Sequence, residues 1–163
     1  MAELVPKLFP LFLFLHLLGV MVGLGPTFVF SRMMSTAAKE PAHIRFTSKL
    51  VRSISSGWSH PLAGLVLLSG FGMIWSISYP VLQTPWLVLS IVLFIPSRLY
   101  AALVQNRDIG RVLELTENGP PAPDSTEGRE AARRRVRIRR GGIYMRLTAL
   151  VILFLMVMKP AFG

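Results

Sequence analysis

One histidine lies deep inside an uncharged stretch of this sequence. His16 sits within residues 8–31, which contain no charged side chain. A helix of that length measures roughly 36 Å, enough to cross the ~30 Å hydrocarbon core of a bilayer. An ionisable side chain inside a membrane is a functional candidate by default. Three roles stay open for His16: a hydrogen bond between helices, axial ligation of a haem, and proton transfer.

Two glycines share the helical face of His16. Gly19 and Gly23 follow it at the i+3 and i+7 positions. Small residues four apart allow another backbone to approach closely, which is a common way for membrane helices to associate. The spacing therefore predicts that Gly19 and Gly23 are helix-packing residues and that His16 faces protein.

Two arginines, Arg98 and Arg146, lie within other apolar stretches. They are expected at similar depth to His60, near the inner membrane surface. No acidic residue in an apolar stretch could pair with Arg98, so we expect it either to extend to the membrane surface or to bind an anion. Candidate anions for both arginines are a lipid phosphate and a haem propionate, and a carboxylate on another subunit is a third candidate for Arg98. His16 and His60 are predicted at different depths, which leaves His16 as a single candidate ligand of haem b.

A run of arginines precedes the last apolar stretch. Clusters of basic residues beside a membrane helix bind anionic lipid, at about 1 kcal/mol per residue near the surface. The alternative is that the run only fixes the topology of the chain. Besides Arg129, the run contains the candidate residues for docking lipid or a partner: Arg133, Arg134, Arg135, Arg137, Arg139 and Arg140.

Four apolar stretches must position these residues. They are residues 8–31, 61–79, 86–104 and 143–160, and they predict an all-α bundle of four transmembrane helices in a single membrane domain. The composition agrees, because 52% hydrophobic residues and a mean hydropathy of +0.53 exceed those of ordinary soluble domains. The first stretch is longer than the apolar core of a signal peptide, and residues 1–7 carry one acid and one base, so we expect it to be retained.

The charged segments predict the orientation. Lys and Arg concentrate in residues 32–60 and 105–142, so the positive-inside rule places both segments in the cytoplasm and both termini outside. Residues 32–60 are expected to form an amphipathic helix on the membrane or against the bundle. Residues 105–142 should continue the third helix, pass through a disordered Pro/Gly linker and end in the arginine run, with Asp124 as N-cap. The net charge of +10 is explained by this pattern rather than by nucleic-acid binding.

Several kinds of active site are missing from the sequence. There is no cysteine, and no pattern predicts a metal-ligand cluster, a pair of membrane carboxylates or a nucleophilic triad. We therefore predict no self-sufficient active site and assign no catalytic residue. The leading interpretation is a non-catalytic accessory or scaffolding subunit of a larger membrane complex, which binds anionic lipids and other membrane subunits or itself.

Two segments carry a family resemblance. LHLLGVMVGLGPTFVFSR and HPLAGLVLLSGFGM resemble a family of small bacterial predicted integral membrane proteins of unknown function. More distantly, the chain is similar to the haem-dependent membrane protoporphyrinogen oxidases and the copper-resistance D group, which are small helical membrane proteins with a histidine in an early span. The resemblance implies a bacterial inner-membrane location. The more distant one implies that His16 is the ligand of a b-type haem, with oxidoreductase activity as the function that it suggests. Unlike the oxidases, this chain has no lysine in a predicted span.

Overall fold

The computed structural model describes residues 7–37 and 39–160, and within these ranges it has helices and no β-strand. Residues 1–6, which contributed to the argument against a signal peptide, lie outside the described residues. The helices are α2 (Phe9–Ala37), α3 (Pro41–Ile54), α4 (His60–Ser76), α5 (Pro85–Tyr100), α6 (Asn106–Leu115) and α7 (Thr126–Met158). Two π-helical segments, η1 (Ser55–Ser59) and η3 (Ala101–Gln105), and one 3-10 turn, η2 (Val81–Gln83), complete the described elements.

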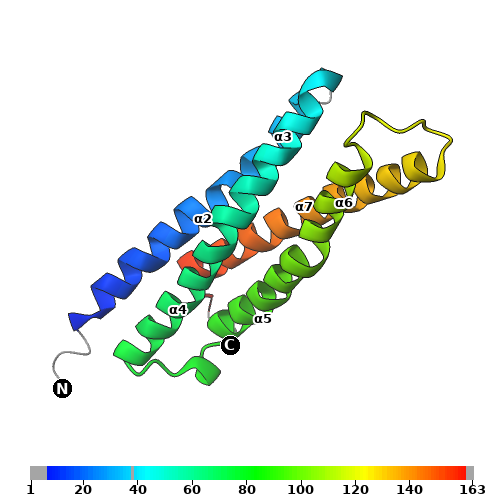
Figure 1. The fold of residues 1–163 in the computed structure, drawn as a ribbon. Helices are drawn as coiled ribbons and strands as arrows, with labels where there is room; N and C mark the ends of the chain where they lie inside the picture. Colours follow the sequence, from blue (N-terminus) through cyan, green and yellow to red (C-terminus); the bar gives the residue numbers. More distant parts are fainter. Residues whose placement is uncertain (1–6, 38, 161–163) are drawn as a thin grey trace.

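The helices form two antiparallel pairs (Figure 1). In the first pair, α2 runs beside one long helix made of α3, η1 and α4. In the second pair, α5, η3 and α6 form another continuous helix, which packs against α7. The pairs meet where α3 contacts α6 and where α2 contacts α7. Figure 1 shows α3 and α6 at the same end of the molecule as the loop that leads into α7.

The amphipathic helix expected within residues 32–60 corresponds to α3, which lies against the bundle, one of its two expected positions. α2 continues to Ala37, and the chain turns into α3, which runs through η1 into α4 without leaving the helical conformation. The predicted second span 61–79 ends early, at Ser76, because the backbone turns before Pro80, and Ser78 takes a positive φ of 49°. The polar helix α3 is therefore an extension of α4, and it packs against α2 and α6.

The arginine run and the predicted last span are one helix. α7 covers 33 residues and passes through Gly141 and Gly142 without a break. Its N-cap is Ser125, not the predicted Asp124, since the Ser125 side chain accepts a hydrogen bond from the Gly128 backbone N–H at 2.9 Å. This bond satisfies one of the free donors of the first turn. The loop before α7 covers residues 116–125, so it begins and ends three residues before the predicted linker, residues 119–128.

Three helices are long and apolar enough to cross a membrane: Phe9–Ala37, Pro85–Leu115 and Thr126–Met158. α4 has 17 residues, which is about 26 Å of helix, and it is not among these three. The structure thus agrees with an all-helical membrane protein.

Candidate functional site

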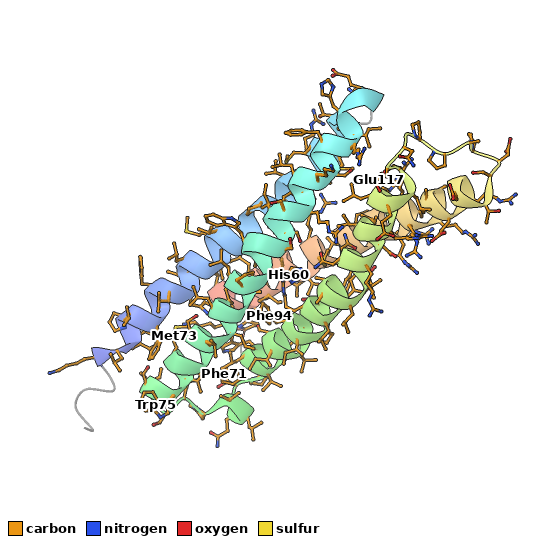
Figure 2. All side chains as sticks on the ribbon, viewed as in Figure 1. His60, Phe71, Met73, Trp75, Phe94 and Glu117 are labelled. Atoms are coloured by element: carbon orange, nitrogen blue, oxygen red, sulfur yellow. The ribbon has the colours of Figure 1, made fainter. Side chains whose placement is uncertain are left out.

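A polar cluster lies where the two long helices change from apolar to charged sequence. It joins His60 at the start of α4, Arg98 on α5 and Asn106 at the start of α6. A π-helical segment immediately precedes both His60 and Asn106. Such segments shift the register of a helix and occur frequently at functional sites. Figure 2 shows His60 between Trp75 at one end of the molecule and Glu117 at the other.

His60 contacts one polar side chain through each of its ring nitrogens. Its Nε2 lies 2.7 Å from the Asn106 amide nitrogen, and its Nδ1 lies 3.5 Å from an Arg98 guanidinium nitrogen. Asn106 Oδ1 is buried without a partner. Rotating the amide by half a turn would let this oxygen accept from Nε2–H and leave Nδ1 free to accept from Arg98, and it would move the unpartnered position to the amide nitrogen. A neutral His60 is the form that can accept from Arg98.

Arg98 is the cation of this cluster. One of its guanidinium nitrogens lies 3.4 Å from the Ser59 carbonyl oxygen, and among the described residues it forms no ion pair with a carboxylate. Ser59 Oγ and Gln105 Oε1 are also buried without a partner. Arg98 thus carries a half-buried positive charge beside a neutral histidine, an arrangement that suits an anion.

The hydrogen bonds that Arg146 donates do not reach this cluster. It donates to Ser31 Oγ at 2.5 Å and to the Gly142 carbonyl at 3.2 Å. It therefore ties α7 to α2. Of the three basic side chains expected near one another, His60 and Arg98 are in contact, and Arg146 bonds elsewhere.

His16 connects the first two predicted spans. Its Nδ1 lies 2.9 Å from the Val66 carbonyl oxygen and 3.3 Å from Ser69 Oγ, both on α4. Because a carbonyl can only accept, Nδ1 carries the proton and Nε2 keeps its lone pair. His16 thus makes the helix-to-helix hydrogen bond that was one of its three open roles.

The two glycines beside His16 are buried against α4. A Cβ at Gly19 would lie 2.8 Å from Val66 Cγ2, and a Cβ at Gly23 would lie 2.9 Å from Leu62 Cβ. Both distances are shorter than van der Waals contact. Only glycine at these positions lets the two backbones approach to this separation, which also sets the reach of His16.

One buried acid, Asp108, binds two arginines of the run, Arg134 and Arg137. Asp108 on α6 is 1% exposed. It accepts two hydrogen bonds from the Arg137 guanidinium and one from Arg134 Nη1 at 2.7 Å. Glu130 bridges Arg134 and Arg111 with distances of 2.9 and 3.2 Å. These ion pairs hold the polar halves of α6 and α7 together.

The ion pairs also set the titration of Asp108, which lies beyond the apolar part of its helix. The hydrogen bond from Arg137, followed by that from Arg134, holds the pKa of this carboxyl below its ordinary value despite burial. A lowered pKa means that Asp108 contributes stability above the unfolded-state pKa, about 3.9. The contribution is lost as pH falls through the lowered value.

Besides Arg129, which is also exposed and makes no ion pair with the described residues, four arginines of the run remain on the outside of α7. They are exposed and make no ion pair with the described residues, and we call them the outer arginine face: Arg133, Arg135, Arg139 and Arg140. At 100° per residue they span one side of the helix, away from Arg134 and Arg137. The sequence did not distinguish the two groups. Asp108 was the available signal, because it is an acid directly after an apolar stretch.

Among the described residues, no group of three or more His, Asp or Glu side chains could hold a metal ion. A family model described as "Predicted integral membrane protein (DUF2269)" matches residues 10–160 of the chain. No curated protein matches, and no solved structure does. The match covers every helix discussed above except the first residue of α2.

Proposed function

The chain belongs to the DUF2269 family of predicted integral membrane proteins, and we propose that it is a non-catalytic accessory or scaffolding subunit of a larger assembly in the bacterial inner membrane. In this proposal α2, α4, α5 and α7 cross the bilayer. The ends that carry α3, α6 and the arginine run lie in the cytoplasm, and both termini lie outside.

The aromatic side chains support a fourth crossing by α4. Trp58 and Trp75 stand near the two ends of its apolar part, and each is 62% exposed. Their separation along the helix corresponds to roughly 26 Å. Tryptophan favours the two membrane–water interfaces, so this spacing fits a slightly thin or locally compressed bilayer.

The single observation that carries the scaffold proposal is that Asp108 pairs with only two arginines of the run and leaves the outer arginine face exposed. Arg134 and Arg137 bind this internal carboxylate, while the outer arginine face stays exposed on a helix that the same ion pairs fix. Four guanidinium groups on a rigid support can form bidentate hydrogen bonds with carboxylates or phosphates. The face therefore suits an acidic surface of another membrane subunit, with anionic lipid as the competing partner.

We expect the outer arginine face to control assembly. Replacing Arg133, Arg135, Arg139 and Arg140 by Gln removes the charge without touching the Asp108 ion pairs. In membranes cross-linked before solubilisation, the wild-type chain should be recovered bound to one defined larger subunit, and the variant should lose at least nine-tenths of that product. The control replaces Arg32, Lys39 and Arg107, which are exposed elsewhere on the polar end and make no ion pair with the described residues, and it should keep the product. Equal cross-linking of the variant and the wild type would contradict the proposal.

A second candidate function is a b-type haem protein. The observation that favours it is the orientation of His16. A histidine that ligates a metal usually donates its other ring N–H to a carbonyl or carboxylate, and His16 donates Nδ1–H to Val66 in this way. The residues present fit one axial ligand, through Nε2. When bound, a haem would supply one-electron chemistry, and Val66 would keep the imidazole ring oriented.

The visible spectrum distinguishes the two candidates. Protein purified in mild detergent from haem-sufficient cells should be colourless if His16 serves only to join α2 and α4. A Soret band with α and β bands after reduction by dithionite, lost in His16→Ala and kept in His43→Ala, would instead establish the haem function. His43 is an exposed residue of α3, and its replacement controls for a nonspecific loss of a histidine.

A further inference from the structure

A cleft of about 390 Å³ opens between α3 and α6. Arg45, Lys49 and Arg52 line its α3 wall, and Gly110 and Glu114 line its α6 wall. None of these residues belongs to the outer arginine face or to the polar cluster around His60. The cleft lies at the polar end of the molecule, where the two helix pairs meet.

The carboxylates at the cleft are already occupied. Glu117, just beyond α6, lies 3.3 Å from an Arg45 guanidinium nitrogen, and its carbonyl oxygen accepts from Arg45 at 2.6 Å. Glu114 pairs with Arg111 at 3.1 Å. Lys49 and Arg52 make no ion pair with the described residues. Two positive charges therefore remain uncompensated in the cleft, next to an Arg45 Nε that is buried without a partner.

Gly110 makes room for the Arg52 guanidinium. A Cβ at this buried glycine would lie 3.2 Å from Arg52 Nη1 and 3.3 Å from Nη2. The guanidinium rests on the backbone of α6, which limits its orientations. A preorganised guanidinium loses less entropy when it binds a phosphate than a freely moving one.

The cleft begins at the membrane surface. Ser56, at its inner end, is two residues from Trp58, so Arg52 stands roughly 9 Å of helix beyond this tryptophan and Lys49 roughly 13 Å. The headgroup layer on one side of a bilayer is on the order of 7 Å thick. With their long side chains, both residues reach phosphate depth.

We propose that this cleft binds the headgroup of one anionic phospholipid, with Arg52 and Lys49 as the ligands of its phosphate. The inference uses the bilayer position given under the proposed function, and it is independent of any partner subunit. A lipid is favoured over a free phosphate ion because the cleft meets the interface at Trp58, so the acyl chains of a bound lipid continue into the hydrocarbon layer.

Native mass spectrometry of the detergent-purified chain tests this site. We expect phosphatidylglycerol to be retained in preference to phosphatidylcholine when both are present in equal amounts. Each basic ligand contributes about fivefold to the affinity, so Lys49→Gln with Arg52→Gln should weaken phosphatidylglycerol binding about 30-fold. The matched control is Lys39→Gln with Arg107→Gln, which removes the same charge from exposed positions outside the cleft and should bind as the wild type does.

Three results would overturn the proposal. The first is equal retention of the two lipids by the wild-type protein, and the second is equal weakening by the cleft and control variants. The third is full displacement of phosphatidylglycerol by millimolar inorganic phosphate, which would assign the cleft to a soluble anion. Thermal melting of both variants confirms that they are folded. Because no partner is present, the outcome is separate from that of the cross-linking experiment.

Discussion

Replacing Arg134 and Arg137 together by Gln should cause the largest loss of folding stability, well above the loss from removing two exposed arginines. Asp108 is almost completely buried, and these two side chains supply its salt bridges. Removing the partners of a buried charge leaves that charge uncompensated in a poorly hydrated site, which is far more harmful than losing a surface pair. Chemical denaturation in detergent micelles, followed by helical circular dichroism, measures the change.

Two further variants make this expectation specific. Arg133→Gln with Arg135→Gln removes the same net charge from exposed positions and should change the stability by less than about 1 kcal/mol. Adding Asp108→Asn to the Arg134/Arg137 variant should recover much of the loss, because the isolated buried charge disappears. If the inner and outer pairs were equally sensitive, Asp108 would not hold the polar ends together.

Gly23→Leu should be the second most damaging of these changes, with a loss of about 1–3 kcal/mol. The new Cβ would lie 2.9 Å from Leu62 Cβ, an atom fixed to the backbone of α4. The helices must therefore separate, and the hydrogen bond from His16 to Val66 must lengthen or break. Thermal unfolding in detergent and protease sensitivity of the loop between α2 and α3 should both report the loosened pair.

Gly25→Leu is the control on the same helix. Nothing lies within 4 Å of a Cβ at Gly25, so a leucine there extends into open space and should leave the melting temperature within about one degree. A similar loss of stability from both substitutions would mean that leucine is harmful because of helix propensity or solubility, and not because of the close approach at Gly23.

Much of the fold follows from local sequence. Long uncharged stretches predict helices of membrane length, and glycines at fixed spacing predict which face of residues 8–31 meets another helix. The π segments η1 and η3 were not predicted from the sequence. Pro61 was a partial signal for η1, because a proline ring displaces the carbonyl of residue i−4, which here is Gly57 within that segment. Residues 101–105 contain no proline, and no local pattern predicts the extra residue in that turn.

The site was predictable only in part for a related reason. Apolar context made His16 and Arg98 conspicuous, since ionisable residues are rare in membrane spans. Gln105 and Asn106 lie at the start of a polar segment, where nothing local separates a buried side chain from a solvated one. The distinction between inner and outer arginines depends on where one carboxylate of α6 meets α7, and that is a tertiary contact.

The most direct test of the scaffold proposal is the mass of the assembly that contains this chain in its own membrane. Membranes are extracted with a polymer that retains native lipid, and the particles that carry a tagged chain are analysed by native mass spectrometry. We expect the 18.1 kDa chain in a defined stoichiometry with at least one larger membrane subunit. Particles that contain only one or two copies of this chain and lipid would contradict the proposal.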